Sequence, residues 1–254
     1  HDWVYTYTIE RNDFTMPANE GTTIACASQL AEPASLPEVK DACGNVLEPT
    51  EASPVISATP ECEGDVTYTY TYVDCEGNSH DWVYTYTIER NDFTMPADGS
   101  RTVACAIDAI APTLPTVTDN CGTALTGSLK SGYPIVSVTD GSGTVTYKYT
   151  YADCEQNTHD WTFVYQVVPN EFTPPTNQSV DVLCSDAVET PITPVITVCG
   201  ENVDLGAPTI SNTVSNGCGE VGYTYTYTVN GVEYTWTYTY YVSPNPFVIT
   251  PSTG

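Results

Sequence analysis

Basic residues are scarce in this sequence: 6 Lys and Arg stand against 32 Asp and Glu, which gives a formal net charge of −26. Binding to a phosphate backbone needs clustered Lys and Arg. This balance therefore excludes nucleic acid as a partner, and it also excludes simple adsorption to anionic lipid. Solubility and self-repulsion explain the acidity, and divalent-cation binding is the alternative explanation.

The sequence also lacks the signals of membrane spans, zinc sites and catalytic sites. No apolar run approaches the roughly 18 residues that a membrane-spanning helix needs, so we expect no membrane insertion. Zinc is disfavoured because no C-x-x-C pair occurs and the three histidines stand singly at one repeated position, namely His1, His80 and His159. No nucleophile recurs beside them, no two carboxylates stand out and no phosphate-binding motif occurs, so we predict no catalytic residues and no enzyme.

An internal repeat with a period of 79 residues organises the chain. Residues 1–18, HDWVYTYTIERNDFTMPA, recur letter for letter at 80–97, and looser copies begin at 159 and near 232. A period of this length predicts small domains in series, and we expect the chain to be a segment of a longer array of repeats. The predicted parts are the last strand of a preceding repeat at 1–12, repeats 1, 2 and 3 at 13–91, 92–170 and 171–244, and the start of a following repeat at 245–254.

Strict alternation of residue types predicts a β-hairpin at the end of each repeat. In repeat 1, residues 66–73 place a valine and three tyrosines on one face and threonines on the other, and residues 82–88 alternate again after a turn. We expect the tyrosine face in the core and the threonine face at the surface. Shorter strands separated by prolines come first, at Thr22–Cys26, Glu38–Lys40, Val46–Glu48 and Val55–Ala58. The pattern predicts an all-β fold of tandem immunoglobulin-like β-sandwich repeats.

The hairpin motif V-x-Y-x-Y-x-Y-x-D-C-E-G-N at residues 66–78 resembles hyalin-repeat-like (HYR-like) modules. Repeat 1 resembles the four-cysteine form of these modules in giant cell-surface adhesins of gliding Bacteroidetes, with Cys26, Cys43, Cys62 and Cys75. The resemblance covers essentially the whole chain, although the turn motif weakens in repeats 2 and 3. It implies a secreted or surface-anchored filament without catalytic residues.

We therefore interpret the chain as a stalk segment of a long adhesin filament at the bacterial cell surface or outside the cell. Its expected partners are neighbouring repeats of the same chain, other filament chains or extracellular polysaccharide. The alternative function is a glycan- or surface-binding module that uses exposed Thr and Tyr faces of the sheets. No cofactor is expected, unless calcium binds.

The ten cysteines occupy recurring positions and indicate disulfide bonds formed in an oxidising compartment. The first two cysteines of a repeat occur together in all three repeats. We predict that they pair within each repeat, as Cys26–Cys43, Cys105–Cys121 and Cys184–Cys199.

The third and fourth cysteines of repeat 1 predict a link between repeats. Cys62 and Cys75 flank a strand that rises roughly 26 Å, whereas a disulfide tolerates Cα atoms only under about 7 Å apart. The two thiols should therefore lie at opposite ends of repeat 1, which leads us to predict a Cys62–Cys154 bond to repeat 2.

The same argument predicts no link between repeats 2 and 3, because Gly141 and Asn230 replace both cysteines of that junction. Cys75 and Cys218 would then pair with repeats outside the chain. The alternative is that these cysteines were lost independently, which would leave Cys154 and Cys218 free.

Two acidic turns are candidate calcium sites, because calcium prefers six to eight oxygen ligands. The candidate ligands are Asp74, Glu76, Asn78 and Asp81 in repeat 1 and Asp153, Glu155, Asn157 and Asp160 in repeat 2. A solvated acidic turn is the alternative interpretation.

Overall fold

The computed structural model describes residues 1–8, 12–184 and 188–245. These residues form three tandem β-sandwich-like repeats, and the all-β prediction is confirmed. The helical elements among them are two 3-10 helices of three residues, η1 (Ala27–Gln29) and η2 (Ala106–Asp108). No helix of this described part is long and apolar enough to cross a membrane. Apart from Asn245, the predicted start of a following repeat lies outside the described residues.

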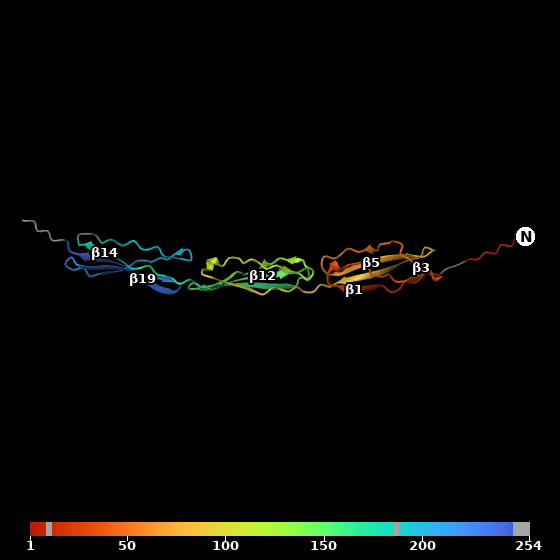
Figure 1. Ribbon diagram of the computed structural model, residues 1–254, viewed down its shortest axis with the longest axis horizontal. Helices are drawn as coiled ribbons and strands as arrows, with labels where there is room; N and C mark the ends of the chain where they lie inside the picture. The colour runs from red at the N-terminus through yellow and green to blue at the C-terminus, as the bar shows by residue number, and fades with distance from the viewer. Residues whose placement is uncertain (9–11, 185–187, 246–254) are drawn as a thin grey trace, which may run out of the picture. The chain divides into compact units, whose positions relative to one another are not determined.

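Repeat 1 is built on a four-stranded sheet with the order β1-β6-β5-β4. Figure 1 labels β1 and β5 of this sheet. The antiparallel hairpin β5–β6 at its centre is the predicted one. A short antiparallel pair, β2–β3, completes the repeat. The strands are β1 (Glu20–Ile24), β2 (Val39–Lys40), β3 (Val46–Leu47), β4 (Val55–Ile56), β5 (Gly64–Val73) and β6 (Ser79–Ile88).

Repeats 2 and 3 repeat this plan. Their main sheets have the orders β10-β12-β13-β7, with β11 also on β12, and β14-β19-β18-β17. The strands of repeat 2 are β7 (Gly99–Val103), β8 (Val117–Thr118), β9 (Ala124–Leu125), β10 (Ser128–Leu129), β11 (Ile135–Thr139), β12 (Ser142–Ala152) and β13 (Thr158–Val167). Those of repeat 3 are β14 (Gln178–Leu183), β15 (Thr197–Val198), β16 (Glu201–Asn202), β17 (Thr209–Asn212), β18 (Gly219–Val229) and β19 (Val232–Ser243).

The first strand of each repeat is an edge strand that runs parallel to the last strand, a pairing that the sequence analysis did not predict. In repeat 1 the register places Glu20 beside Tyr84 and Ile24 beside Ile88. The pairs β7–β13 and β14–β19 are parallel in the same way. The end of β1 therefore lies beside the end of β6, from which the chain continues into the next repeat.

The tyrosine face of β5 forms the core of repeat 1, as predicted. Val66 and the three tyrosines that alternate with threonine after it are at most 5% exposed. Phe14 and Val39 belong to the same buried cluster, together with Trp82 from β6. Large aromatic side chains supply much of the apolar surface that so small a domain can bury.

Polar contacts fasten the opening segment of each repeat to the hairpin that closes it. The Trp82 indole donates to the Ala18 carbonyl at 3.0 Å, and His80 Nε2 contacts the Asp13 carboxylate at 2.9 Å. Repeat 2 has the same two contacts, Trp161 with Ala97 and His159 with Asp92. The segment 80–97 therefore serves two repeats, because its first residues close repeat 1 and its last residues open repeat 2.

Residues 1–8 form no strand, although their sequence is identical to that of 80–87. Trp3 is 89% exposed, whereas Trp82 is 1% exposed. In repeat 1 this sequence has β5 on one side and β1 on the other. Alternation alone therefore does not make a strand here, and residues 9–11 of the predicted strand at 1–12 lie outside the described residues.

The described chain divides into two compact units, and the division passes through repeat 2. The first unit contains the described residues within 1–97, 114–128 and 149–161, and the second contains those within 98–113, 129–148 and 162–254. Each unit holds one junction between neighbouring repeats, so each junction is described within its own unit.

Candidate functional site

Three disulfide bonds join neighbouring repeats. Cys26–Cys121 and Cys62–Cys154 connect repeats 1 and 2, and their Cα–Cα distances are 5.6 and 5.7 Å. Cys105–Cys199 connects repeats 2 and 3, with a Cα–Cα distance of 5.6 Å. The Cys62–Cys154 bond is the one that the sequence analysis predicted.

The pairs predicted within repeats, Cys26–Cys43, Cys105–Cys121 and Cys184–Cys199, are wrong, because Cys26, Cys105, Cys121 and Cys199 all bond to other repeats. The prediction that no disulfide joins repeats 2 and 3 is also wrong. The physical reason is the parallel edge strand: Cys26 follows β1, whose end lies beside Ile88 at the exit toward repeat 2. The first cysteine of a repeat therefore bonds forward, and the second bonds backward.

Four cysteines take no part in these three bonds. Cys43, Cys184 and Cys218 are exposed thiols. The fourth is Cys75. The assignment of Cys75 and Cys218 to repeats outside the chain stays a prediction.

Asp119 builds the turn that presents Cys121 to repeat 1. Its carboxylate accepts the N–H groups of Cys121 at 2.9 Å and Thr123 at 2.7 Å. Gly122 completes the turn with φ of 86°, a left-handed conformation that glycine adopts without strain. Burial acts to raise the pKa of Asp119, but the hydrogen bonds from Thr123 and Cys121 and the charge of Arg90 lower it below its ordinary value of 3.8.

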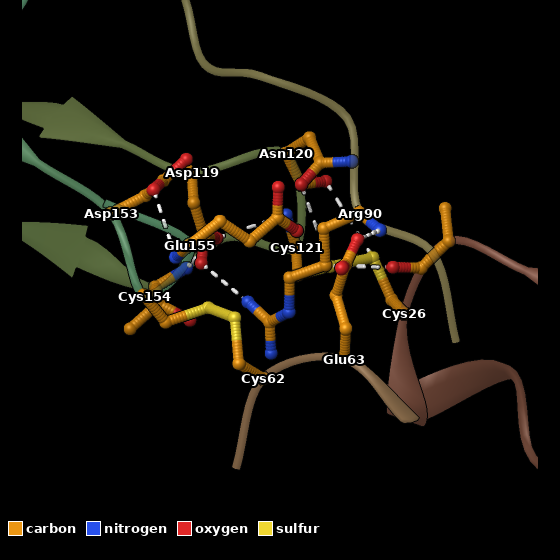
Figure 2. Close-up of polar contacts among 12 residues, drawn as sticks. Cys26, Cys62, Glu63, Arg90, Asp119, Asn120, Cys121, Asp153, Cys154 and Glu155 are labelled. Carbon is orange, nitrogen blue, oxygen red and sulfur yellow. Dashed lines mark hydrogen bonds and ion pairs between the residues drawn. A yellow bond between two sulfur atoms is a disulfide. The ribbon is translucent and has the colours of Figure 1, made fainter. Parts of the chain in front are cut away.

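Arg90 lies between the two disulfide bonds of the first junction, as Figure 2 shows. Its guanidinium donates to Asp119 at 2.8 Å, and the two side chains are only 14% and 6% exposed. Its backbone N–H donates to the Glu63 carboxylate at 3.0 Å. The chain has only six basic residues, and one of them forms this nearly buried ion pair at the junction between repeats 1 and 2.

Glu63 and Glu155 face each other across the same junction (Figure 2). Burial raises the pKa of Glu155 above its ordinary value of 4.5, and the hydrogen bond and negative charge of Glu63 raise it further. One oxygen, Glu155 Oε1, is buried without a hydrogen-bond partner. Protonation of this carboxyl would remove a charge and supply a donor, so the junction is most favourable when Glu155 is neutral.

The second junction brings together the two residues that replace the missing cysteines. A Cβ placed on Gly141 would lie 3.3 Å from the Asn230 Cβ and closer still to its side-chain oxygen. In the opposite direction, a Cβ placed on Gly231 would lie 2.7 Å from the Asp140 carboxyl carbon. At the second junction, two tight turns therefore pack against each other at the positions that the Cys62–Cys154 bond occupies at the first junction.

Both residues of the Arg90–Asp119 ion pair are replaced at the second junction. By the period of 79 residues, Pro169 stands at the position of Arg90 and Val198 at that of Asp119. Loss of one partner alone would leave a buried charge without compensation, which is strongly destabilising. The two residues that contact each other across the first junction are thus both replaced at the second, as contact between the repeats requires.

The acidic turns are hydrogen-bonded turns, and the calcium interpretation stays a prediction. Asp74 Oδ1 accepts the N–H groups of Glu76 and Asn78, each at 2.9 Å, and Asp153 does the same in repeat 2. Asp81 and Asp160 instead accept from Thr71 and Thr150 on the neighbouring strand. Within the described residues, no group of three or more His, Cys, Asp or Glu side chains is arranged to hold a metal ion.

Comparison of the sequence with protein families agrees with this architecture. The model of the HYR-like domain with 4 cysteines matches residues 14–88, 93–167 and 172–242. The chain belongs to this family. The four-cysteine module of the family is complete in repeat 1, whereas repeats 2 and 3 each have three cysteines. No curated protein matches the chain.

Solved structures to which the chain is similar include cadherin ectodomains and part of one hydrolase. Mouse cadherin-23 EC22–24 is 10% identical over 93% of this chain and 99% of that chain, with a TM-score of 0.32. The endo-fucoidan hydrolase MfFcnA4 from glycoside hydrolase family 107 is 13% identical over 81% of this chain and 40% of that chain, with a TM-score of 0.27. Similarity at this level says nothing about function.

Proposed function

We propose that this chain is a stalk segment of a secreted or surface-attached adhesin filament, in which HYR-like repeats serve as covalently cross-linked spacers. The observation that carries the proposal is that all three disulfide bonds among the described residues join one repeat to the next. Disulfide bonds persist in oxidising compartments, which supports a location outside the cytoplasm. We further propose that the adhesin belongs to a gliding bacterium, on the basis of the family resemblance alone.

The disulfides provide a short covalent route along the chain. From Cys26 the route crosses to Cys121, returns along the backbone to Cys105 and crosses to Cys199. It bypasses residues 27–104 and 122–198. A force applied at the two ends would therefore load the Cys26–Cys121 and Cys105–Cys199 bonds and the segment between Cys105 and Cys121. It would leave the β5–β6 hairpin and the Cys62–Cys154 bond outside the loaded path.

The two junctions differ in their number of links. Repeats 1 and 2 share two disulfides and the Arg90–Asp119 ion pair, whereas repeats 2 and 3, over their described residues, share one disulfide and no such pair. Interfaces between domains in one chain are usually small, and relative motion is the default expectation. We therefore expect the first junction to resist bending more than the second.

The alternative of a glycan-binding face is not favoured, because the sheet tyrosines are largely committed to the core. Tyr70, Tyr149 and Tyr225, at the same position in the three repeats, are 5%, 8% and 2% exposed. Their rings pack against the buried tryptophan of the neighbouring strand. The threonine faces remain, and Tyr241 of β19 is exposed on one of them.

Two measurements test the stalk proposal. Immunoelectron microscopy with antibodies raised against this chain should label filaments on the surface of the source cells, and label confined to the cytoplasm would contradict the proposal. A glycan array probed with the oxidised 254-residue chain should give no reproducible binding. Saturable binding to one glycan class would favour the alternative.

A further inference from the structure

Cys26–Cys121 and Cys105–Cys199 are the same bond at successive junctions, but their surroundings differ. Two hollows of about 190 and 320 Å³ lie at the second junction, and both have Cys105 and Cys199 in their lining. Cys199 is exposed and Cys105 is half-buried. The bond of the second junction therefore borders open space in two places.

The hollows lie where the polar cross-links of the first junction have been replaced. Pro169 and Val198 stand at the positions of Arg90 and Asp119. Pro169 lines the smaller hollow, and Val198 lines both. Shorter, uncharged side chains thus replace a nearly buried ion pair and leave space beside the disulfide. The larger hollow also includes the two residues that replace the bonded cysteines, Gly141 and Asn230.

Cys26–Cys121 is covered by neighbouring atoms, and both of its cysteines are half-buried. The Asn120 side-chain oxygen lies 3.7 Å from Cys121 Sγ, and the Ala25 carbonyl oxygen lies 3.4 Å from the same atom. The Asn120 carbonyl oxygen lies 3.9 Å from Cys26 Sγ. Arg90 lies beside this bond as well (Figure 2). These groups restrict the approach of a reagent to its sulfur atoms.

The turn that carries Cys199 lacks both the covering residue and the clamp of the first junction. Asn120 stands between Asp119 and Cys121, whereas Cys199 directly follows Val198. The Asp119 carboxylate accepts the Cys121 N–H at 2.9 Å, and the valine has no side-chain acceptor to do the same. The second cysteine is therefore less covered and less firmly held in repeat 3 than in repeat 2.

We propose that Cys105–Cys199 is a site of thiol–disulfide exchange, which a dithiol reductant opens while Cys26–Cys121 stays closed. The rate of exchange depends on the access of the attacking thiolate to a disulfide sulfur. The hollows give that access at the second junction, and the covering groups restrict it at the first. This sensitivity is a property of the bond and does not depend on the stalk function.

The covalent step is an exchange with a dithiol such as dithiothreitol. One thiolate of the dithiol attacks the Cys199 sulfur, the Sγ–Sγ bond breaks, and Cys105 leaves as a thiolate. The second thiolate of the dithiol then attacks the reductant sulfur of the mixed disulfide and releases Cys199. The dithiol is oxidised to a cyclic disulfide, and its two electrons and two protons pass to the two cysteines.

The two junctions would respond differently to mild reduction. Over the described residues, one disulfide joins repeats 2 and 3, so its reduction would leave the backbone and non-covalent contacts to hold them. Reduction of Cys62–Cys154, whose Cys154 is also exposed, would leave repeats 1 and 2 joined by Cys26–Cys121. Mild reduction would therefore turn the second junction into a flexible joint and keep the first junction linked.

Limited reduction followed by peptide mapping tests this proposal. The thiols of the oxidised chain are first blocked with iodoacetamide, the chain is treated with a low concentration of dithiothreitol in native buffer, and new thiols are trapped with N-ethylmaleimide. Label on Cys105 and Cys199 should appear at least roughly tenfold faster than label on Cys26 and Cys121. Equal rates, or faster labelling of Cys26 and Cys121, would overturn the proposal.

The double variant Pro169→Arg and Val198→Asp restores the side chains of the first junction beside the second bond. It should slow the labelling of Cys105 and Cys199 by at least roughly threefold. The bond at the first junction should keep its rate and serves as the internal control. An unchanged rate at the second bond, in a variant whose circular dichroism matches that of the parent, would overturn the proposal. If the variant does not fold, the two rates in the parent chain decide.

Discussion

Gly141 and Asn230 lie in contact at the junction between repeats 2 and 3, with 3.3 Å between the Asn230 Cβ and an ideal Cβ on Gly141. The bonded cysteines Cys62 and Cys154 occupy the same two positions at the previous junction. Cβ atoms of a disulfide are usually about 3.5–4.5 Å apart. The second junction thus retains the arrangement of a bond that its sequence no longer forms.

The double substitution Gly141→Cys and Asn230→Cys should therefore create a fourth disulfide. Both positions have positive φ, 77° and 49°, and a side chain at Gly141 would be strained there, so Gly141→Cys alone should cost about 1 kcal/mol or more of stability. Non-reducing peptide mapping of the double variant should show a disulfide-linked peptide pair that joins positions 141 and 230. If both new thiols react fully with an alkylating agent in the oxidised protein, the proposed contact is wrong.

Arg90→Ala should destabilise the junction between repeats 1 and 2. The substitution leaves the Asp119 carboxylate buried without its cation, and breaking such a pair typically costs about 3 kcal/mol. Arg101→Ala is the matched control, because Arg101 is exposed on β7, and it should change the unfolding free energy by less than about 0.5 kcal/mol. Chemical denaturation measures the unfolding free energy of both variants. Equal losses would show that the Arg90–Asp119 ion pair does not stabilise the junction.

The Glu63–Glu155 contact should make stability depend on pH. The pKa of Glu155 is raised in the folded state, so between its ordinary value of 4.5 and the raised pKa this carboxyl is protonated more in the folded chain than in the unfolded chain. Stability should therefore fall as the pH rises from 4.5 through the raised pKa. Glu155→Gln should remove this part of the pH dependence of the unfolding free energy.

Glu76→Gln provides the control for that titration, since Glu76 occupies the same turn position in repeat 1 and is exposed. Its pH profile should match that of the parent chain. Parallel profiles for Glu155→Gln and the parent would show that the carboxyl pair does not influence folding.

Two tryptophans in identical sequence should respond differently to truncation. Trp82→Ala removes a 1% exposed side chain that packs on Tyr70 and should cost about 3–5 kcal/mol. Trp3→Ala changes an 89% exposed side chain and should leave the melting temperature unaltered. A comparable loss in both variants would mean that residues 1–8 are packed against the protein.

The contrast between Trp3 and Trp82 also shows what the sequence could predict. Alternation within Gly64–Val73 and Ser79–Ile88 identified the hairpins and their buried faces, because period two is a local signal. The parallel pairing of Ile24 with Ile88 joins strands far apart in the sequence, and no local pattern encodes it. Without that pairing, Cys26 could not be placed at the exit of its repeat.

The same distinction between local signals and long-range contacts applies to the disulfide bonds. A strand of known rise separated Cys62 from Cys75, so geometry excluded that pair, and the joint absence of both cysteines at Gly141 and Asn230 supported a bond with Cys154. For Cys26 and Cys43 the sequence offered only their joint occurrence, which agrees equally with pairing inside a repeat and with pairing between repeats. The Asp119–Cys121–Gly122 turn was present in the sequence but gave no indication of its partner.

The central claim is that the disulfides form a continuous covalent route from repeat to repeat, and single-molecule stretching from the two ends tests it most directly. The shortest route in the oxidised chain omits residues 27–104 and 122–198. At roughly 3.6 Å per extended residue, the oxidised chain should reach less than about half the contour length of the reduced chain. If oxidised and reduced chains unfold to the same contour length, the repeats are not joined as described.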